Sequence, residues 1–151
     1  AFAPEAARLV CAGAAPEALK ARGNTLPLAV PAESRRRGCR IEIDFAVADA
    51  ALAARAATSA QVELVGLKRV HAAFPERLSV RGAGIRLATR PGGGLTLSVA
   101  LETLLGGDRR RGAALILVWR SGEGAEARSF LSPTLMIERV EPAAPLRTKR
   151  I

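Results

Sequence analysis

The sequence predicts a mainly β protein, an antiparallel sandwich or barrel of about six to eight strands with a helical N-terminal segment. Three observations support this fold class. Apolar and polar residues alternate with period two in 40–47 and 95–101, as in half-buried strands. Glycine-rich turns separate the later apolar segments. With 151 residues, the chain is long enough for one domain with its own hydrophobic core.

Residues 1–34 are predicted to form a helical arm and a connector. Pro4 and Pro16 are each followed by glutamate, an arrangement that favours a first helical turn, and Gly23-Asn24 would end the helix. The residues from 24 to 34 contain two further prolines, so we expect them to be extended.

A β-rich domain is predicted over residues 35–142. Its first strand covers 40–47, where apolar side chains alternate with Glu42 and Asp44. We expect these two carboxylates on the solvent face, in exposed ion pairs with neighbouring arginines. Asp49 can cap a short alanine-rich helix over about 50–59. The further strands are expected at about 61–70 (with Gly66 as a bulge), 77–89 (broken by Gly82-Ala83-Gly84), 95–101, 113–120 and 128–140.

The segment from Leu95 to Trp119 is predicted to be a β-hairpin. Alternation places the leucines of 95–101 toward the core, and the unbroken apolar run 113–120 suits a central strand that is buried on both faces. Arg109–Arg111 would project from the connecting turn. The alternative is a helix over 95–105, because its leucines also fit helical spacing.

Cys11 and Cys39 are the two cysteines of the chain. We expect two separate reduced thiols, because two cysteines do not make a disulfide framework. The alternative is a bridge formed in an oxidising compartment, which would stabilise the fold by roughly 3 kcal/mol in the loop-entropy model. Two thiols and the single histidine, His71, do not make a zinc site, so no metal is expected.

The net charge of +9 and the sequence pI of about 11.3 predict an anionic partner. Most of the positive charge is arginine, whose planar guanidinium group can form two parallel hydrogen bonds with phosphate. The alternative is a basic surface that is merely solvated. The candidate anion-binding residues are Arg35, Arg36, Arg37, Arg40, Arg77, Arg81, Arg109, Arg110, Arg111, Arg147, Lys149 and Arg150.

Enzymatic motifs are missing from the sequence. It has no phosphate-binding loop, nucleophile elbow or metalloprotease helix motif, and Gly92-Gly93-Gly94 leads into a strand rather than a helix. His71 lies at the end of a predicted strand, where a structural role is expected. The sequence therefore predicts a protein that is not an enzyme, with no catalytic residue and no cofactor.

The leading hypothesis is a structural subunit of a ribonucleoprotein-like or capsid-like assembly. Its partners would be other protein subunits and the backbone of a nucleic acid, RNA in particular. Few aromatic residues are available to stack on bases, which argues against base-specific recognition. Residues 143–151 would form a basic C-terminal tail. A further possibility is an exported envelope or adhesive β-sandwich subunit with a Cys11–Cys39 bridge.

The sequence is consistent with more than one compartment. The chain does not begin with Met, and organelle import, export and association with a virion all remain consistent with it. No apolar run reaches the length of a membrane-spanning helix, so no transmembrane segment is expected.

Two short segments resemble the signatures of PilZ domains. Arg36 and Arg40 form an RxxxR pattern before a strand, and Ser79 and Gly82 lie in a segment similar to the family's [DN]xSxxG motif, with Arg77 where the family has Asp or Asn. PilZ domains are small β-barrels that bind cyclic di-GMP. The resemblance implies that the two arginines would bind guanine and phosphate groups and that Ser79 and Gly82 would shape the barrel side of the site.

Overall fold

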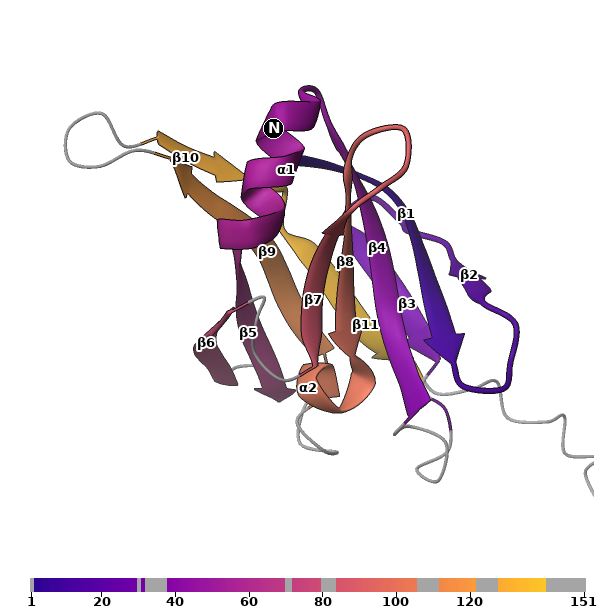
Figure 1. The fold of residues 1–151 in the computed structure, drawn as a ribbon. Helices are drawn as coiled ribbons and strands as arrows, with labels where there is room; N and C mark the ends of the chain where they lie inside the picture. Colours follow the sequence, from indigo (N-terminus) through magenta and orange to yellow (C-terminus); the bar gives the residue numbers. More distant parts are fainter. Residues whose placement is uncertain are drawn as a thin grey trace, which may run out of the picture.

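A computed structural model describes residues 2–29, 31, 38–69, 72–79, 84–105, 112–121 and 128–140, with side chains throughout except in 64–79 and at 121 and 128. Within these ranges the protein is mainly β and forms two sheets, one in front of the other in Figure 1. The predicted fold class is confirmed to that extent.

The first sheet has five strands in the order β2-β1-β4-β8-β7. All its neighbours are antiparallel. Its strands are β1 (Phe2–Cys11), β2 (Glu17–Leu19), β4 (Cys39–Val47), β7 (Ile85–Thr89) and β8 (Leu95–Ala100).

The second sheet has six strands in the order β3-β11-β9-β5-β6, and β10 pairs with β9 beyond the end of β11. β3 and β11 are parallel, whereas the other described pairs of this sheet are antiparallel. Its strands are β3 (Thr25–Ala29), β5 (Gln61–Arg69), β6 (Ala72–Ser79), β9 (Gly112–Ser121), β10 (Arg128–Leu131) and β11 (Leu135–Val140).

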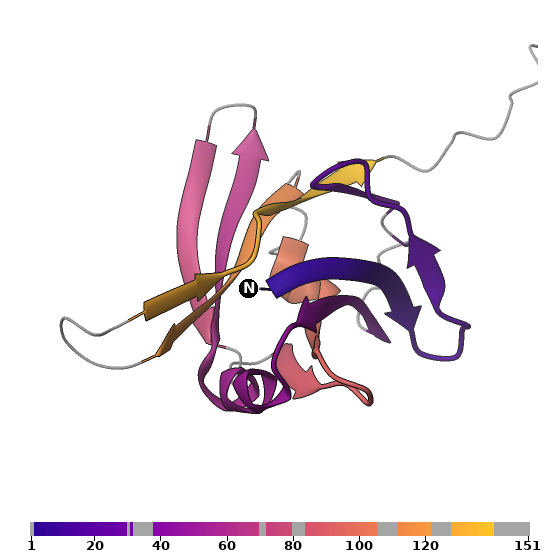
Figure 2. The ribbon, with the colours of Figure 1, turned by 90° about the horizontal axis from the view of Figure 1, so that it is seen from above.

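Two helices connect the sheets. α1 (Ala50–Ser59) leads from β4 in the first sheet to β5 in the second, and α2 (Leu101–Leu105) leads from β8 to β9. Figure 1 shows α1 at one end of the sandwich and α2 at the other. Seen from above in Figure 2, the sheets curve around a common interior, and the β5–β6 hairpin extends beyond it.

Inward-facing side chains from both sheets fill the core. Ile41, Ile43 and Phe45 of β4 are buried, as the alternation predicted. Leu115 and Leu117 of β9 meet them from the second sheet as part of one core cluster. α2 closes one end of this core with three buried leucines.

The helical N-terminal segment predicted for residues 1–23 is wrong. These residues form β1 and β2, and the first helix of the described chain is α1. β1 pairs with β4 along its whole length, so long-range pairing overrides the helical preference of its alanines. Among the described residues, β2 pairs only with Ala7–Leu9, so no described strand continues the sheet on the outer side of β1 at Pro4, where a proline is tolerated.

The connector predicted after residue 23 is extended, but it is part of the fold. β3 carries Pro27 and forms the edge of the six-stranded sheet, a position where a proline costs no central hydrogen bond. Strands from residues 2–29 thus belong to the same two sheets as the strands that follow residue 38.

The hairpin predicted for Leu95–Trp119 is wrong. Both strands exist, but β8 pairs with β4 and β7, whereas β9 pairs with β5, β10 and β11. The chain turns into α2 at Leu101 and crosses to the other sheet. The strand alternative therefore holds for 95–100 and the helix alternative for 101–105. Arg109–Arg111 lie outside the described residues.

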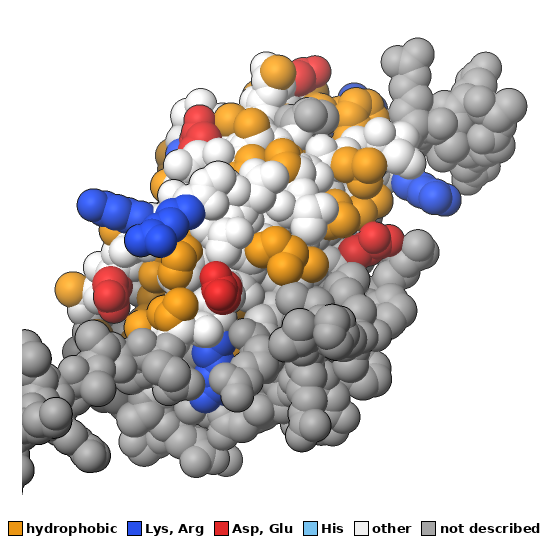
Figure 3. Space-filling view, turned by 180° about the vertical axis from the view of Figure 1, so that it is seen from behind, with side chains coloured by type: hydrophobic (Ala, Val, Ile, Leu, Met, Phe, Trp, Pro, Cys, Tyr) orange, Lys and Arg blue, Asp and Glu red, His pale blue; other side chains and the backbone are white. Residues whose placement is uncertain are grey.

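β9 is central in its sheet, as predicted, but it is not fully buried on both faces. Ala113, Leu115 and Leu117 are buried, whereas the alternate residues Ile116 and Val118 are half-buried on the outer face. Figure 3 views the molecule from behind and shows hydrophobic side chains spread over the surface there.

The remaining local predictions agree with the structure in part. The single strand predicted over 128–140 divides into β10 and β11. Asp49 caps α1, with its side chain accepting a hydrogen bond from the Ala51 amide at 2.9 Å. The 77–89 candidate divides into β6 and β7. The irregularity in β5 lies between Leu67 and Arg69 rather than at Gly66. Gly94 has a φ of +96°, and a Cβ there would meet the Phe45 carbonyl oxygen, so the turn before β8 requires glycine.

Candidate functional site

Most of the predicted anion-binding residues lie outside the residues whose side chains the structure describes. Arg77 lies on β6, but its side chain is not among those described. The following residues, like His71, lie outside the described residues: Arg35, Arg36, Arg37, Arg81, Arg109, Arg110, Arg111, Arg147, Lys149 and Arg150. Arg40 is the candidate whose side chain the structure does describe, and it belongs to a polar cluster on the five-stranded sheet.

The centre of this cluster is Arg8 on β1. Its Nε donates to Glu42 Oε1 at 2.8 Å, and its two terminal nitrogens donate to the Asp44 carboxylate at 2.7 and 3.3 Å. The cross-strand register explains this contact, since Arg8 is opposite Glu42 and Ala6 is opposite Asp44 on the outer face.

Asp44 is buried, contrary to the expectation that both carboxylates of β4 form exposed ion pairs. Thr96 of β8 donates to Asp44 Oδ1 at 2.7 Å, so the carboxylate accepts hydrogen bonds from both neighbouring strands. Its charge is therefore compensated within the sheet, as burial requires.

Two more arginines border the cluster. Arg40 donates through Nε to Glu42 Oε2 at 3.1 Å and is half exposed. Arg90 donates to Glu5 at 2.8 Å and approaches Asp44 at 3.9 Å. Glu42 is thus held between Arg8 and Arg40, so each of its oxygens has an arginine partner.

These contacts shift the pKa of both carboxyls in the same direction. The hydrogen bonds from Arg8 lower the pKa of Asp44, and they outweigh the effect of burial. For Glu42, burial acts to raise the pKa, but the combined hydrogen bonds from Arg40 and Arg8 bring it below its ordinary value. The pKa of Arg8 is raised, chiefly by its hydrogen bond to Asp44. Both acids are therefore held as carboxylates at neutral pH.

An open hollow of about 600 Å³ lies beside this cluster on the same outer face. Small residues of β8 form its floor, and β4 and β7 form its two sides, because β8 lies between them in the sheet. The lining residues are Arg40, Glu42, Gly84, Arg86, Ala88, Thr96, Ser98 and Ala100.

Arg86 on β7 faces this hollow from the side opposite Glu42. Glu42, Ser98 and Arg86 occupy one row across the three strands. Arg86 is exposed, and its guanidinium has no ion-pair or hydrogen-bond partner among the described residues. The hollow therefore carries an uncompensated positive charge next to a hydroxyl group.

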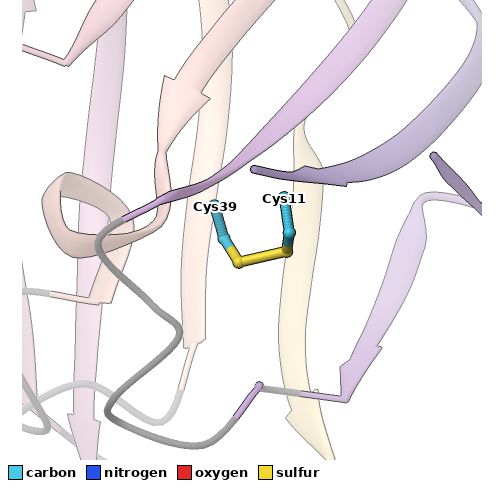
Figure 4. The surroundings of a disulfide bond; sticks show 2 residues. All are labelled: Cys11 and Cys39. Carbon is cyan, nitrogen blue, oxygen red and sulfur yellow. A yellow bond between two sulfur atoms is a disulfide. The ribbon is translucent and has the colours of Figure 1, made fainter. Parts of the chain in front are cut away.

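Cys11 and Cys39 form a disulfide bond, which corrects the expectation of two reduced thiols (Figure 4). The two residues are directly opposite each other in the β1–β4 register. The pairing of these strands brings the thiols together, a long-range contact that their separation of 28 residues does not reveal.

A second cluster surrounds Trp119 on β9. Its ring stacks on Phe130 of β10 at 5.1 Å between centroids, and the Arg55 guanidinium of α1 lies 5.9 Å from the ring. The indole nitrogen donates to Ser59 at 2.7 Å. Trp119 is buried, so this cluster fixes α1 to the second sheet rather than presenting an aromatic platform.

The described residues contain no group of acidic, histidine or cysteine side chains that could hold a metal ion. In the same part of the chain, no helix has both the length and the apolar character that crossing a membrane would need.

The two PilZ-like segments lie on different sheets where the structure describes them. Arg40 begins β4 in the first sheet, and Ser79 ends β6 at the edge of the second. Arg36 and Gly82 are outside the described residues. No protein-family model matches the chain, and no similar sequence is found among curated proteins.

Arg8, Arg86 and Arg90 were not among the predicted site residues. Each is a single arginine within or next to a strand, without the clustering that drew attention to residues 35–40 and 109–111. Alternation within β7 and β8 could have placed Arg86 and Ser98 on outer faces, but only the strand order shows that these faces adjoin.

Proposed function

We propose that this chain is a non-enzymatic β-sandwich subunit of an exported assembly, and that its basic surface contacts an anionic polymer of the cell envelope. The observation that carries the proposal is the Cys11–Cys39 disulfide. Disulfides form and persist in oxidising compartments and are rare in the cytosol. The exported subunit, an alternative on sequence grounds, thereby becomes the leading interpretation.

The polar cluster supports a binding role rather than a catalytic one. Both oxygens of Glu42 and both oxygens of Asp44 accept hydrogen bonds, and the pKa of each carboxyl is lowered. A carboxylate that is fully paired and weakly basic is a poor proton acceptor, because general bases work best with a pKa near the operating pH. These acids instead stabilise an arginine-rich surface.

The redox state of the native protein tests the export half of the proposal. Material isolated without reductant should resist alkylation at Cys11 and Cys39 and should show both in one cross-linked peptide by mass spectrometry. The same protein should be recovered from an extracytoplasmic fraction. Free alkylation of both thiols in native material would contradict export.

Recovery of partners tests the assembly half separately. Mild cross-linking of native material before extraction should place the chain in a complex larger than itself. A well-behaved monomer with no cross-linked partner would contradict the role of a subunit.

The nucleic-acid-binding subunit remains a second candidate, favoured by the net charge of +9 and by the arginine clusters. A backbone-directed binder should lose affinity for generic RNA and DNA log-linearly with salt. Absence of binding at about 50 mM salt, where such contacts are strong, would rule this candidate out. Calorimetry with cyclic di-GMP tests the PilZ-like alternative. That alternative expects saturable binding that is lost in Arg40→Ala, and absence of binding heat would exclude it.

A further inference from the structure

We infer that the hollow on the outer face of the five-stranded sheet is a binding site for an acidic polysaccharide, a sugar chain that carries carboxylate or sulfate groups. This inference rests on the proposed function and specifies the polymer and the place where it binds. We call this place the β4–β8–β7 hollow, with the lining residues given above.

The first argument is the shape of the hollow. Its floor consists of short side chains, Thr96, Ser98 and Ala100, and the β7 side adds Ala88. Longer side chains on β4 and β7 border this floor. The result is an open trough along a strand, which suits a segment of an extended polymer more than an enclosed small molecule.

The second argument is the free hydrogen-bonding capacity of the two arginines. Arg40 uses its Nε on Glu42, and its terminal nitrogens have no partner among the described residues. Arg86 is wholly unpaired within the same part of the chain. Strand spacing and rise place their Cα atoms roughly 12 Å apart, on opposite sides of the trough. Each guanidinium can form two hydrogen bonds with a carboxylate or sulfate group.

The third argument distinguishes a polysaccharide from a nucleic acid. Glu42 lies in the trough as a carboxylate and can accept hydrogen bonds from sugar hydroxyls, which are abundant along a polysaccharide. Ser98 can both donate to and accept from such hydroxyls. None of the described residues that line the trough is aromatic, so none of them can stack on a base. The combination of arginines, a carboxylate and hydroxyl groups in the trough therefore fits an acidic sugar chain better than a nucleic acid.

The neighbouring ion pairs keep this site in place. Arg8 holds Glu42 and Asp44, and Thr96 connects Asp44 to the floor strand. The carboxylates are therefore not free to fold over the trough and neutralise Arg86. This preorganisation lowers the cost of binding.

The test compares Arg86→Gln with Arg120→Gln in the full chain under non-reducing conditions. Arg120 is an exposed arginine on β9 in the other sheet, so both variants lose the same charge. The probes are polygalacturonate oligomers, dextran sulfate, neutral dextran and a single-stranded RNA of similar length, with binding measured by calorimetry. Comparing polygalacturonate with dextran sulfate shows whether the site prefers a carboxylate or a sulfate group.

We expect saturable binding of at least one acidic polysaccharide and none of neutral dextran. Arg86→Gln should weaken this binding about tenfold, the effect of losing one charge-assisted hydrogen bond, and Arg120→Gln by less than about twofold. Ser98→Leu should also weaken it by filling the trough. Trp119 fluorescence should be unchanged in Arg86→Gln, which verifies folding independently.

Three results would overturn the inference. Polysaccharide binding that is equally affected by Arg86→Gln and Arg120→Gln would place the contact elsewhere and leave the proposed function intact. Absence of polysaccharide binding in disulfide-bonded protein would reject the acidic polysaccharide as the ligand of the hollow, but it would not contradict the proposed export of the chain. Tighter binding of RNA than of either polysaccharide, lost in Arg86→Gln, would assign the hollow to nucleic acid.

Discussion

Arg8 is the residue on which the outer face of the five-stranded sheet depends. It is one-third exposed, yet it compensates two carboxylates of the next strand, one of which is buried. Removing it would leave Asp44 with Thr96 and the more distant Arg90 as its remaining partners. Loss of one partner from a largely buried ion pair costs more than loss of a surface pair.

We therefore expect Arg8→Met to lower the free energy of unfolding by about 1–3 kcal/mol, measured by urea denaturation. Arg40→Met is the matched control, because Arg40 is half exposed and makes one contact with Glu42. It should cost less than about 1 kcal/mol. Equal losses in the two variants would show that the Arg8 contacts add nothing beyond surface pairing.

The same residues predict a pH dependence of stability. The folded state lowers the pKa of Asp44 and of Glu42 from ordinary values of 3.8 and 4.5. Groups with a lowered pKa stabilise the fold above their ordinary pKa, and this contribution is lost as the pH falls through the folded-state pKa. The free energy of unfolding should fall below about pH 5, with a smaller fall in Arg8→Met. A parallel fall in both proteins would contradict the assignment to these carboxylates.

Sequence alone predicted the phase of β4 but not the environment of Asp44. Alternation with Ile41 and Ile43 correctly placed the carboxylates on the outer face. Arg8, which covers Asp44, lies 36 residues earlier in the chain. Local periodicity does not contain that information, because it depends on which strand pairs with β4.

At the scale of elements, α1 shows how small side chains bring a helix close to a sheet. α1 packs against β7 and β4, and the buried residues of this helix are Ala53 and Ala56. Asp49 and the alanine run were sufficient to predict this helix. Its position over the sandwich, by contrast, depends on Trp119 and Phe130, which lie far along the chain.

Ala56→Leu should therefore destabilise the protein by about 1–3 kcal/mol, because there is no room beside a residue that is fully buried. Ala54 lies on the exposed face of the same helix, and Ala54→Leu should change the stability by less than about 0.5 kcal/mol. Thermal melting followed by circular dichroism would measure both. A neutral Ala56→Leu would indicate that α1 does not pack closely on the sheet.

At the scale of the whole molecule, strand order is the feature that the sequence revealed least. Period-two segments predicted the β class and most later strands, but residues 2–11 contain alanine and proline instead of alternating branched residues. Their β structure comes from pairing with β4. The crossing of the chain between sheets at α2 was hidden for the same reason, since Leu95–Ala100 and Gly112–Ser121 look like neighbours in sequence.

The disulfide and the single tryptophan together test whether the two sheets form one cooperative unit. Cys11–Cys39 joins β1 and β4 of the first sheet, while Trp119 lies on β9 of the second. A core shared by both sheets couples their unfolding. Replacing both cysteines by serine should cost about 3 kcal/mol and lower the Tm by roughly 6–12 °C.

That decrease should be the same whether it is followed by Trp119 fluorescence or by far-ultraviolet circular dichroism, although the lost bond is in the opposite sheet. Reductant should lower the Tm of the wild-type protein in the same way and should leave the double-serine variant unchanged, which controls for effects of the reductant itself. A fluorescence transition that stays in place while the circular dichroism transition moves would mean that the six-stranded sheet is stable without the five-stranded one. The β4–β8–β7 hollow would then belong to a separately unfolding layer, and binding of an anionic polymer there would stabilise that layer alone.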